Sequence, residues 1–296
     1  MASRSARLGS GVATLYYDET SPSIRLIAET VMPGGTDGVD NGSTVSYTLE
    51  MSSRPSHLFL RRGPTLLYDG DDAGKAAGIL LDDLTRALVT DCRDGLVFHA
   101  AALAHGDFAV IIPGPSGTGK TTLAAWMMRR GLRLLNDEVA LVDRDANTVQ
   151  SFVRPLAIKP GGIDAMRRWM NLGDGTTTLT TSASTLVAPA HLGSSRTCGS
   201  PILSAVIFPV RQEGGAVSLE PLSTAETAFG LAGCLVNAAN LRDGGFPDLV
   251  RLATRVAGGR LIYRDVEDLA DGVLTPWLTS AWQRAVSLRQ SSSPCS

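Results

Sequence analysis

Lysine is scarce in this chain of 296 residues. Lysine and arginine together number 27, yet the only lysines are Lys75, Lys120 and Lys159. The formal net charge is −2, so the chain lacks the strong basic field that collects nucleic acid or anionic lipid. We therefore expect neither a nucleic-acid partner nor a membrane partner, and a specific role is favoured wherever a lysine does occur.

Other features are absent as well. The four cysteines show neither zinc-ligand nor C-x-x-C spacing, which suits a reducing cytoplasm. No apolar run approaches the length that spans a membrane, and the stretch Gly11–Tyr17 is too short and interrupted for a signal peptide. An apolar fraction of 44% with 19% charged residues is typical of a folded protein. We expect a cytoplasmic chain with one large core or two smaller ones.

One octapeptide, which begins at Gly114, fits the phosphate-binding pattern G-x-x-x-x-G-K-[ST]. The run Phe108–Ile112 before it predicts a buried strand, and the stretch Thr121–Arg130 after it predicts a helix. In such a loop the backbone N–H groups turn toward one point, where the helix N-terminus adds partial positive charge. The pattern therefore predicts that a nucleoside triphosphate is bound by Gly114, Pro115, Ser116, Gly117, Thr118, Gly119, Lys120, Thr121 and Thr122.

Two side chains of this loop carry its chemistry. Lys120 is expected to reach the β- and γ-phosphates, and the Thr121 hydroxyl is expected to ligate Mg²⁺. ATP and Mg²⁺ are thus the expected cofactors. The alternative is a glycine-rich turn between a strand and a helix, with no ligand.

Two adjacent acids, Asp137 and Glu138, lie inside an otherwise apolar stretch that predicts a strand over Leu132–Val142. Buried carboxylates are costly unless a metal ion or hydrogen-bond donors receive them. After a phosphate-binding loop, one such acid serves Mg²⁺ directly or through water. Neighbours on a regular strand face opposite sides, but at a strand end or a bulge both acids could face the phosphates. The alternative is a pair of solvated acids on an edge strand.

The rest of the chain predicts an α/β fold with a β-rich start. Alternation between residues 13 and about 69 predicts short antiparallel strands, and Gly74–Cys92 predicts a helix. From His99 onward strands alternate with helices. The early strands are expected at Ser23–Ile27, Thr44–Leu49 and His57–Leu60, the later ones near Ser151–Ala157, Leu203–Pro209 and Arg260–Arg264, and the helices at Gly162–Met170, Thr224–Asn237, Phe246–Val256 and Trp277–Leu288.

This organisation predicts three parts. Residues 1–72 are expected to form a β-rich subdomain that docks a substrate or a partner chain, residues 73–290 a P-loop domain, and residues 291–296 a disordered tail. Residues 173–200 are rich in Thr, Ser and Gly and are expected to form a mobile or partly ordered loop that closes over the site.

The order of these motifs resembles the HPr kinase/phosphorylase family. The matching residues are His99–Leu123 and Arg130–Glu138, against a family pattern of a histidine, a strand, G-x-S-G-x-G-K-[ST], a helix and R-G-h-x-L-h-x-D-D. The likeness is specific over residues 99 to 138 and diffuse to about residue 270. It implies the compact kinase fold shared with phosphoenolpyruvate carboxykinases, and an ATP- and Mg²⁺-dependent transfer of phosphate to a serine hydroxyl.

The resemblance also implies roles for single residues. Asp137, as the first acid, would be the general base toward the acceptor hydroxyl, and Glu138 would help Thr121 to hold Mg²⁺. His99 matches the family's histidine near the acceptor, whereas His105 does not match and is expected at a loop or strand edge.

One departure changes the expected acceptor. The family's second signature, E-x-R-G-x-G-x-[IL], which belongs to dephosphorylation and hexamer assembly, is not found. Instead Arg154–Lys159 resembles the R-P-[IL]-x-[IL]-K segment of stand-alone HPr-kinase-like proteins, including those encoded beside lasso peptides and other ribosomal peptides. This implies a peptide acceptor, with Arg154 and Lys159 binding phosphate oxygens or an acceptor carboxylate. The alternative is that both are ordinary surface cations.

Several alternatives stay open. A small-molecule kinase on the same fold and a regulatory nucleotide-binding module or NTPase both fit the loop. ATP and GTP are both open as the nucleotide, although the N-K-x-D motif by which GTPases read the base is absent. The oligomeric state, a homo-oligomer included, is open too.

Overall fold

The computed structural model divides into two compact units, each described by itself. Unit 1 comprises Met1–Cys92 with Phe152–Arg196, and unit 2 comprises Arg93–Ser151 with Thr197–Ser296. The residues that the structure describes are 1–38, 42–54, 56–90, 92–168, 172, 178–189, 199–269 and 271–292.

The limits of unit 1 differ from the boundary expected at residue 72. Helix α2 (Ala73–Thr90) packs against helix α1 (Pro22–Val31) and the strands of this unit, so the unit reaches Cys92. Residues 152–196, expected in the P-loop domain, also belong to it. Of the tail expected at 291–296, residues 291 and 292 end helix α7, and 293–296 lie outside the described residues.

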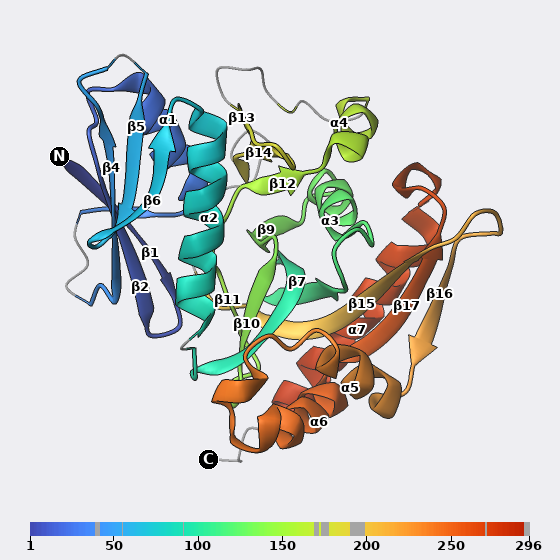
Figure 1. Ribbon diagram of the computed structural model, residues 1–296. Coiled ribbons are helices and arrows are strands. Elements are labelled where there is room, and N and C mark those ends of the chain that lie inside the picture. The colour runs from blue at the N-terminus through green and yellow to red at the C-terminus, as the bar shows by residue number, and fades with distance from the viewer. Residues whose placement is uncertain are drawn as a thin grey trace. The chain divides into compact units, whose positions relative to one another are not determined.

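Unit 1 contains a six-stranded sheet in the order β3-β1-β2-β4-β5-β6 (Figure 1). Four of its pairings are antiparallel, as expected, but β2 and β4 run parallel. A parallel pair needs a crossover, and α1 supplies it. The strands are β1 (Ala2–Leu8), β2 (Gly11–Tyr17), β3 (Thr36–Asp37), β4 (Val45–Met51), β5 (Leu58–Arg62) and β6 (Thr65–Gly70).

The strand expected at Ser23–Ile27 is wrong, because this segment forms part of α1. The Ser21 hydroxyl accepts a hydrogen bond from the backbone N–H of Ile24, and Pro22 occupies the first helical turn. The buried residues Ile24, Ile27, Ala28 and Val31 recur at the spacing of a helix face.

The remainder of unit 1 is a small sheet in the order β12-β14-β13, formed by Leu156–Ile158, Thr185–Val187 and Thr178–Thr180. Helix α4 (Pro160–Arg167) follows β12, where a helix was expected. The loop expected over 173–200 thus contains two paired strands, and its residues 173–177 and 190–198 lie outside the described residues.

Unit 2 is built on a larger mixed sheet in the order β11-β10-β7-β8-β15-β17-β16, with β9 also pairing with β7. Strands β8, β15 and β17 are mutually parallel, whereas β7 is antiparallel to β8 and β10. The α/β class is therefore confirmed. The strands are β7 (Gly95–His105), β8 (Phe108–Pro113), β9 (Arg133–Asn136), β10 (Val139–Asp143), β11 (Val149–Gln150), β15 (Ile202–Arg211), β16 (Ser218–Leu222) and β17 (Ala257–Tyr263).

Helices cover both faces of this sheet. On β17, a Cβ atom placed on Gly258 would meet Thr227 of α5, and one placed on Gly259 would meet Trp277 of α7. Because neighbouring residues on a strand face opposite sides, α5 and α7 cover opposite faces. The helices are α3 (Lys120–Met128), α5 (Thr224–Ala232), α6 (Phe246–Arg255) and α7 (Asp271–Ser292), with the short η2 (Ala238–Asn240), η3 (Arg242–Gly245) and η4 (Val266–Asp268).

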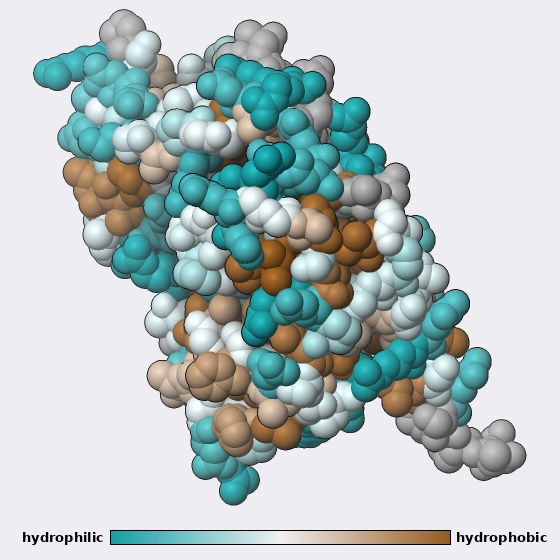
Figure 2. All heavy atoms as spheres, turned by 90° about the vertical axis from the view of Figure 1, so that its right-hand side faces the viewer, coloured by the Kyte–Doolittle hydropathy of each residue, from teal (hydrophilic) through white to brown (hydrophobic). Residues whose placement is uncertain are grey.

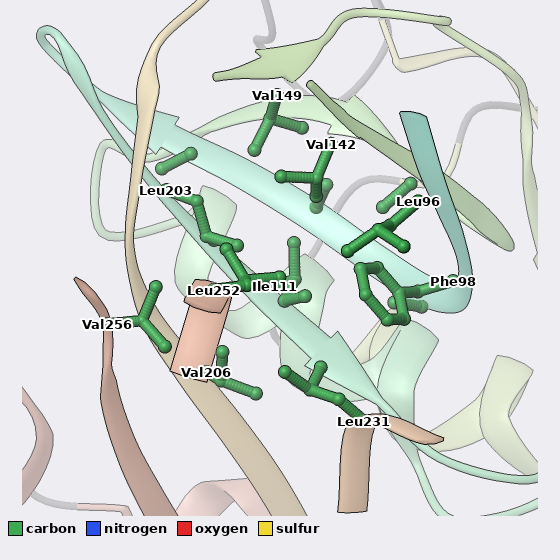
Figure 3. Packing of buried hydrophobic residues seen from close by; sticks show 14 of the residues in the cluster. Leu96, Phe98, Ile111, Val142, Val149, Leu203, Val206, Leu231, Leu252 and Val256 are labelled. Carbon is green, nitrogen blue, oxygen red and sulfur yellow. The ribbon is translucent and has the colours of Figure 1, made fainter. Parts of the chain in front are cut away.

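The core on the α5 side joins these helices to β8, which leads into the loop of residues 114–119, and to β7. Phe98 of β7 and Ile111 of β8 belong to one buried cluster with Leu231 of α5 and Leu252 of α6 (Figure 3). This packing fixes β7 and β8, from which the loop and His99 project, as a rigid base for a site.

Three expected elements have different limits. The strand expected over Leu132–Val142 breaks at Asp137 and Glu138 into β9 and β10. Most of Ser151–Ala157 is irregular, between β11 and β12. The helix expected over Thr224–Asn237 ends at Ala232, and Gly233 caps it.

The surface is mixed in character. On the face drawn in Figure 2, apolar surface occurs in several separate areas among hydrophilic side chains. Phe229 and Phe246 of unit 2 are exposed by 84% and 62%. Among the described helices, none is both long and apolar enough to cross a membrane.

Candidate nucleotide-binding site

The loop of residues 114–119 leaves β8 and leads into α3, as the sequence predicts. Gly114, Gly117 and Gly119 have φ values of 153°, 94° and 90°. L side chains rarely adopt such values, so the glycines of the motif are required by the backbone path itself. Gly119 is also the N-cap of α3, which brings the positive end of that helix to the loop.

Lys120 lies over this loop. Its Nζ atom donates to the carbonyl oxygens of Gly114 at 2.7 Å and Pro115 at 3.0 Å, and the residue is only 7% exposed. The ammonium group is therefore held directly beside the loop. From there it could donate to phosphate oxygens in place of these two carbonyl oxygens.

Thr121 and Asp137 meet although 16 positions separate them. The Thr121 hydroxyl lies 3.1 Å from each carboxylate oxygen of Asp137, which is 4% exposed. The sequence predicted that one acid of the pair serves the metal ion with Thr121, and implied Glu138 for this role. The carboxylate that contacts the Thr121 hydroxyl is that of Asp137.

Glu138 lies at the break between β9 and β10 and has a φ of 119°. Its backbone N–H and C=O both bond to Ala100 of β7, so the chain bulges here without losing its pairing. A positive φ in a non-glycine residue is strained, and such strain is frequent at functional sites. This bulge gives the two neighbouring acids different partners.

The partner of Glu138 is His99. The His99 Nε2 atom lies 3.4 Å from a carboxylate oxygen of Glu138, and their side chains are 28% and 49% exposed. An imidazole next to a solvent-accessible carboxylate can accept, hold or pass on a proton. His99 of β7 and Glu138, at the break between β9 and β10, therefore bring two ionisable side chains together.

A segment that the sequence did not single out, Cys234–Asn237, also borders His99. The backbone N–H of His99 donates to the Cys234 carbonyl at 2.7 Å, and the Gly114 N–H donates to the His99 carbonyl at 3.4 Å. The same edge of β7 therefore carries the start of the loop and Cys234. The pKa of the Cys234 thiol is raised by burial, against the opposing effects of Lys120 and the Gly114 N–H.

Asn237 holds this segment in place. Its side-chain amide accepts from the backbone N–H of Val97 and donates to the carbonyl of Gly95, both at 2.9 Å. A buried amide that bonds in this way imitates a further β-strand residue. Glycines at 230 and 233 are the sequence signal that the helix ends before this segment.

Of the remaining predicted residues, two belong to unit 1 and one lies at the end of β7. Arg154 and Lys159 belong to unit 1, where Arg154 is buried and Lys159 is the N-cap of α4. His105 ends β7, at the strand edge expected for it, and stacks on Trp282. No group of three or more metal-ligating His, Cys, Asp or Glu residues occurs in the described part of the chain.

Comparisons with known proteins add one likeness. No family model and no curated protein matches the sequence. Among solved structures, the chain is similar to the Hpr(Ser) kinase/phosphatase from Coxiella burnetii, with a TM-score of 0.28 and 13% identity, over 66% of this chain and 92% of that one. A likeness at this level assigns neither an activity nor a ligand to the chain.

Proposed function

We propose that the chain binds a nucleoside triphosphate with Mg²⁺ and transfers its γ-phosphate to a hydroxyl group. The observation that carries this proposal is the contact between the Thr121 hydroxyl and the Asp137 carboxylate, next to a loop with three glycines at positive φ. In proteins with a phosphate-binding loop, Mg²⁺ is held by the Ser or Thr hydroxyl at the start of the loop helix and by an aspartate of a neighbouring strand.

The residues present fit Mg²⁺. This ion takes oxygen ligands, and in phosphotransfer sites it is bound by one or two protein groups together with phosphates and water. Thr121 and Asp137 are two such groups, so a cluster of three protein ligands is not needed. Bound Mg²⁺ would neutralise charge on the phosphate oxygens.

The other groups supply the remaining chemistry. The loop N–H groups and Lys120 hold the β- and γ-phosphates. The acceptor oxygen attacks the γ-phosphorus, the bond from that phosphorus to the bridging oxygen breaks, and the nucleoside diphosphate leaves. The acceptor proton passes to the pair formed by Glu138 and His99.

This assignment exchanges two roles that the family resemblance implies. There, Asp137 is the base and Glu138 the metal ligand. The contact of Asp137 with Thr121, and that of Glu138 with His99, support the opposite roles. A buried carboxylate suits a metal ion, whereas a half-exposed carboxylate beside an imidazole suits proton transfer from an incoming acceptor.

For the acceptor we propose a serine hydroxyl on a flexible peptide, such as a ribosomal natural-product precursor. Unit 1 supports a docking role, because it contains a cavity of about 390 Å³ whose lining includes Arg86, Ser10, Thr44 and Arg62, the last of which also pairs with Asp83. Arginines with nearby hydroxyls suit a peptide carboxylate. Arg154 and Lys159 stay candidates for the same task. A small-molecule acceptor and a regulatory NTPase remain the rival functions.

One experiment separates these possibilities. The protein is incubated with ATP, Mg²⁺ and either peptides ending in serine, matched peptides ending in alanine, or small hydroxyl metabolites, and the products are weighed by mass spectrometry. We expect one phosphate to be gained by serine peptides alone. Transfer only to a metabolite supports the small-molecule kinase, and ATP hydrolysis without any transfer supports the NTPase.

A further inference from the structure

Arg211 ends strand β15 at the edge of the sheet where the phosphate-binding loop lies. Strands β8, β15 and β17 are parallel, and Arg211 is in register with Tyr263, the last residue of β17. The carboxyl ends of parallel strands meet at one edge, where α/β proteins bind their ligands. Arg211 and Tyr263 are therefore on the same side of the sheet as the loop that follows β8.

Both side chains lie against the last glycine of the loop. A Cβ atom placed on Gly119 would lie 3.1 Å from the Tyr263 hydroxyl and 3.6 Å from the Cδ atom of Arg211. The Arg211 Nε atom donates to the carbonyl of Arg264 at 3.2 Å. This bond anchors the base of the guanidinium group close to the N-terminus of α3.

Among the described residues, Arg211 differs from the neighbouring arginines because no carboxylate pairs with it. Arg260 pairs with Glu220, and Arg264 pairs with Asp268. Within the part of the chain that the structure describes, Arg211 has no such carboxylate partner. Its guanidinium group is exposed to solvent and can receive an anion.

The position of this charge is unfavourable unless an anion binds. A cation beside a helix N-terminus is repelled by the helix dipole, and Lys120 already adds a positive charge there. One acid at the start of the helix, Asp137, is in contact with Thr121. A polyanion that binds the loop would relieve the repulsion between these groups.

We infer that Arg211 is a second phosphate-binding cation, which contacts the phosphates that are not transferred. This inference rests on the proposed function. Strands β9 and β10, which flank the two acids, pair with β7 on one side of β8, whereas Arg211 comes from β15 on the other side. Arg211 therefore approaches the phosphate chain from the side opposite to the acids that serve the reacting phosphate. Tyr263 is the register partner of Arg211 and lies against the same glycine.

Calorimetric titration with Mg²⁺–ADP and Mg²⁺–ATP tests this inference. Arg211→Ala should weaken the binding of both nucleotides by about tenfold or more, because a charge-assisted contact is lost. Arg211→Lys should restore part of the affinity, since it keeps the charge but not the planar donor group. Arg260→Ala, which removes an arginine already paired with Glu220, is the matched control and should stay within about twofold of the unchanged protein.

The outcomes are distinct. Unchanged affinity of Arg211→Ala for both nucleotides overturns the inference, as does an equal loss in Arg260→Ala. A loss for ATP with none for ADP overturns the assignment to the phosphates that are not transferred. Absence of binding by the unchanged protein overturns the proposed function as well. Thermal unfolding of each variant without nucleotide shows whether a loss arises from damage to the fold.

Discussion

The hydroxyl of Thr121 lies 3.1 Å from both carboxylate oxygens of Asp137. Thr121 is in the first turn of α3, which follows the loop. Asp137 follows β9, and β9 pairs with the edge of β7 opposite to β8. Folding therefore brings together a hydroxyl and a carboxylate that come from separate segments. In the proposed function this pair defines where Mg²⁺ binds, and the roles of the other groups follow from it.

Lys120→Ala should weaken nucleotide binding by about two orders of magnitude, because several charge-assisted hydrogen bonds to phosphate are lost together. Calorimetry with Mg²⁺–ATP measures this. Lys75→Ala, an exposed lysine in unit 1, is the control and should bind as the unchanged protein does. If Lys120→Ala binds Mg²⁺–ATP as tightly as the unchanged protein does, the loop does not use its lysine to bind phosphate.

His99→Asn should slow phosphate transfer by roughly 10²-fold while leaving the dissociation constant for ATP nearly unchanged, because a proton acceptor is lost and not a phosphate ligand. Single-turnover kinetics with a peptide acceptor separates the two effects. His57→Asn changes a histidine of unit 1 that is paired with Asp69 and Asp71, and it is the control. If His99→Asn transfers phosphate at the normal rate, the acid–base assignment is wrong.

Asn237→Ala should lower the free energy of unfolding by about 1–3 kcal/mol, since it leaves the Val97 N–H and the Gly95 carbonyl without their buried partner. Chemical denaturation checks this. We also expect slower phosphate transfer, because the segment that bonds to His99 loses its anchor. Normal stability would show that this segment is held by other contacts.

The stability of unit 2 should fall above pH 10. Burial raises the pKa of the Tyr263 phenol to about 12, from 10.0, against a smaller opposing effect of Arg211. A raised pKa means that the folded state holds this proton more tightly than the unfolded state does. The contribution of the protonated Tyr263 phenol to the stability of unit 2 is complete below pH 10 and is lost as the pH rises toward 12.

Tyr263→Phe checks this pH dependence, because it removes the titrating group and should flatten the decline in unfolding free energy between pH 10 and 12. The Tyr263 hydroxyl has no hydrogen-bond partner among the described residues, so the variant should lose no stability at neutral pH. Tyr16→Phe in unit 1 is the control. A decline of the same steepness in both variants would contradict the assignment.

The local part of the site could be predicted from sequence. The phosphate-binding loop, β8 and α3 follow from one contiguous motif, in which glycine, lysine and threonine each have a fixed position. Two adjacent acids fit poorly in a buried strand, so the sequence also allows a strand end or a bulge at Asp137 and Glu138. Which acid would contact Thr121 depends on the bulge at Glu138, and no local pattern determines that.

Other features depend on contacts between distant segments. Arg211 and Tyr263 become neighbours only through the parallel pairing of β15 with β17, and Cys234–Asn237 reaches β7 across more than a hundred residues. Alternation predicted a strand at Ser23–Ile27, although Ser21 and Pro22 are helix-start signals that were available in the sequence. The docking role of unit 1 and the acceptor stay predictions.

The dependence of ATP binding on Mg²⁺ in Asp137→Asn tests the central claim most directly. The unchanged protein should bind ATP more tightly as Mg²⁺ is added, and Glu138→Gln should keep this gain. Asp137→Asn should lose most of it, because its carboxylate is the one that lies beside the Thr121 hydroxyl. An unchanged Mg²⁺ dependence in Asp137→Asn, with a loss in Glu138→Gln instead, would contradict this account and support the reverse roles of the two acids.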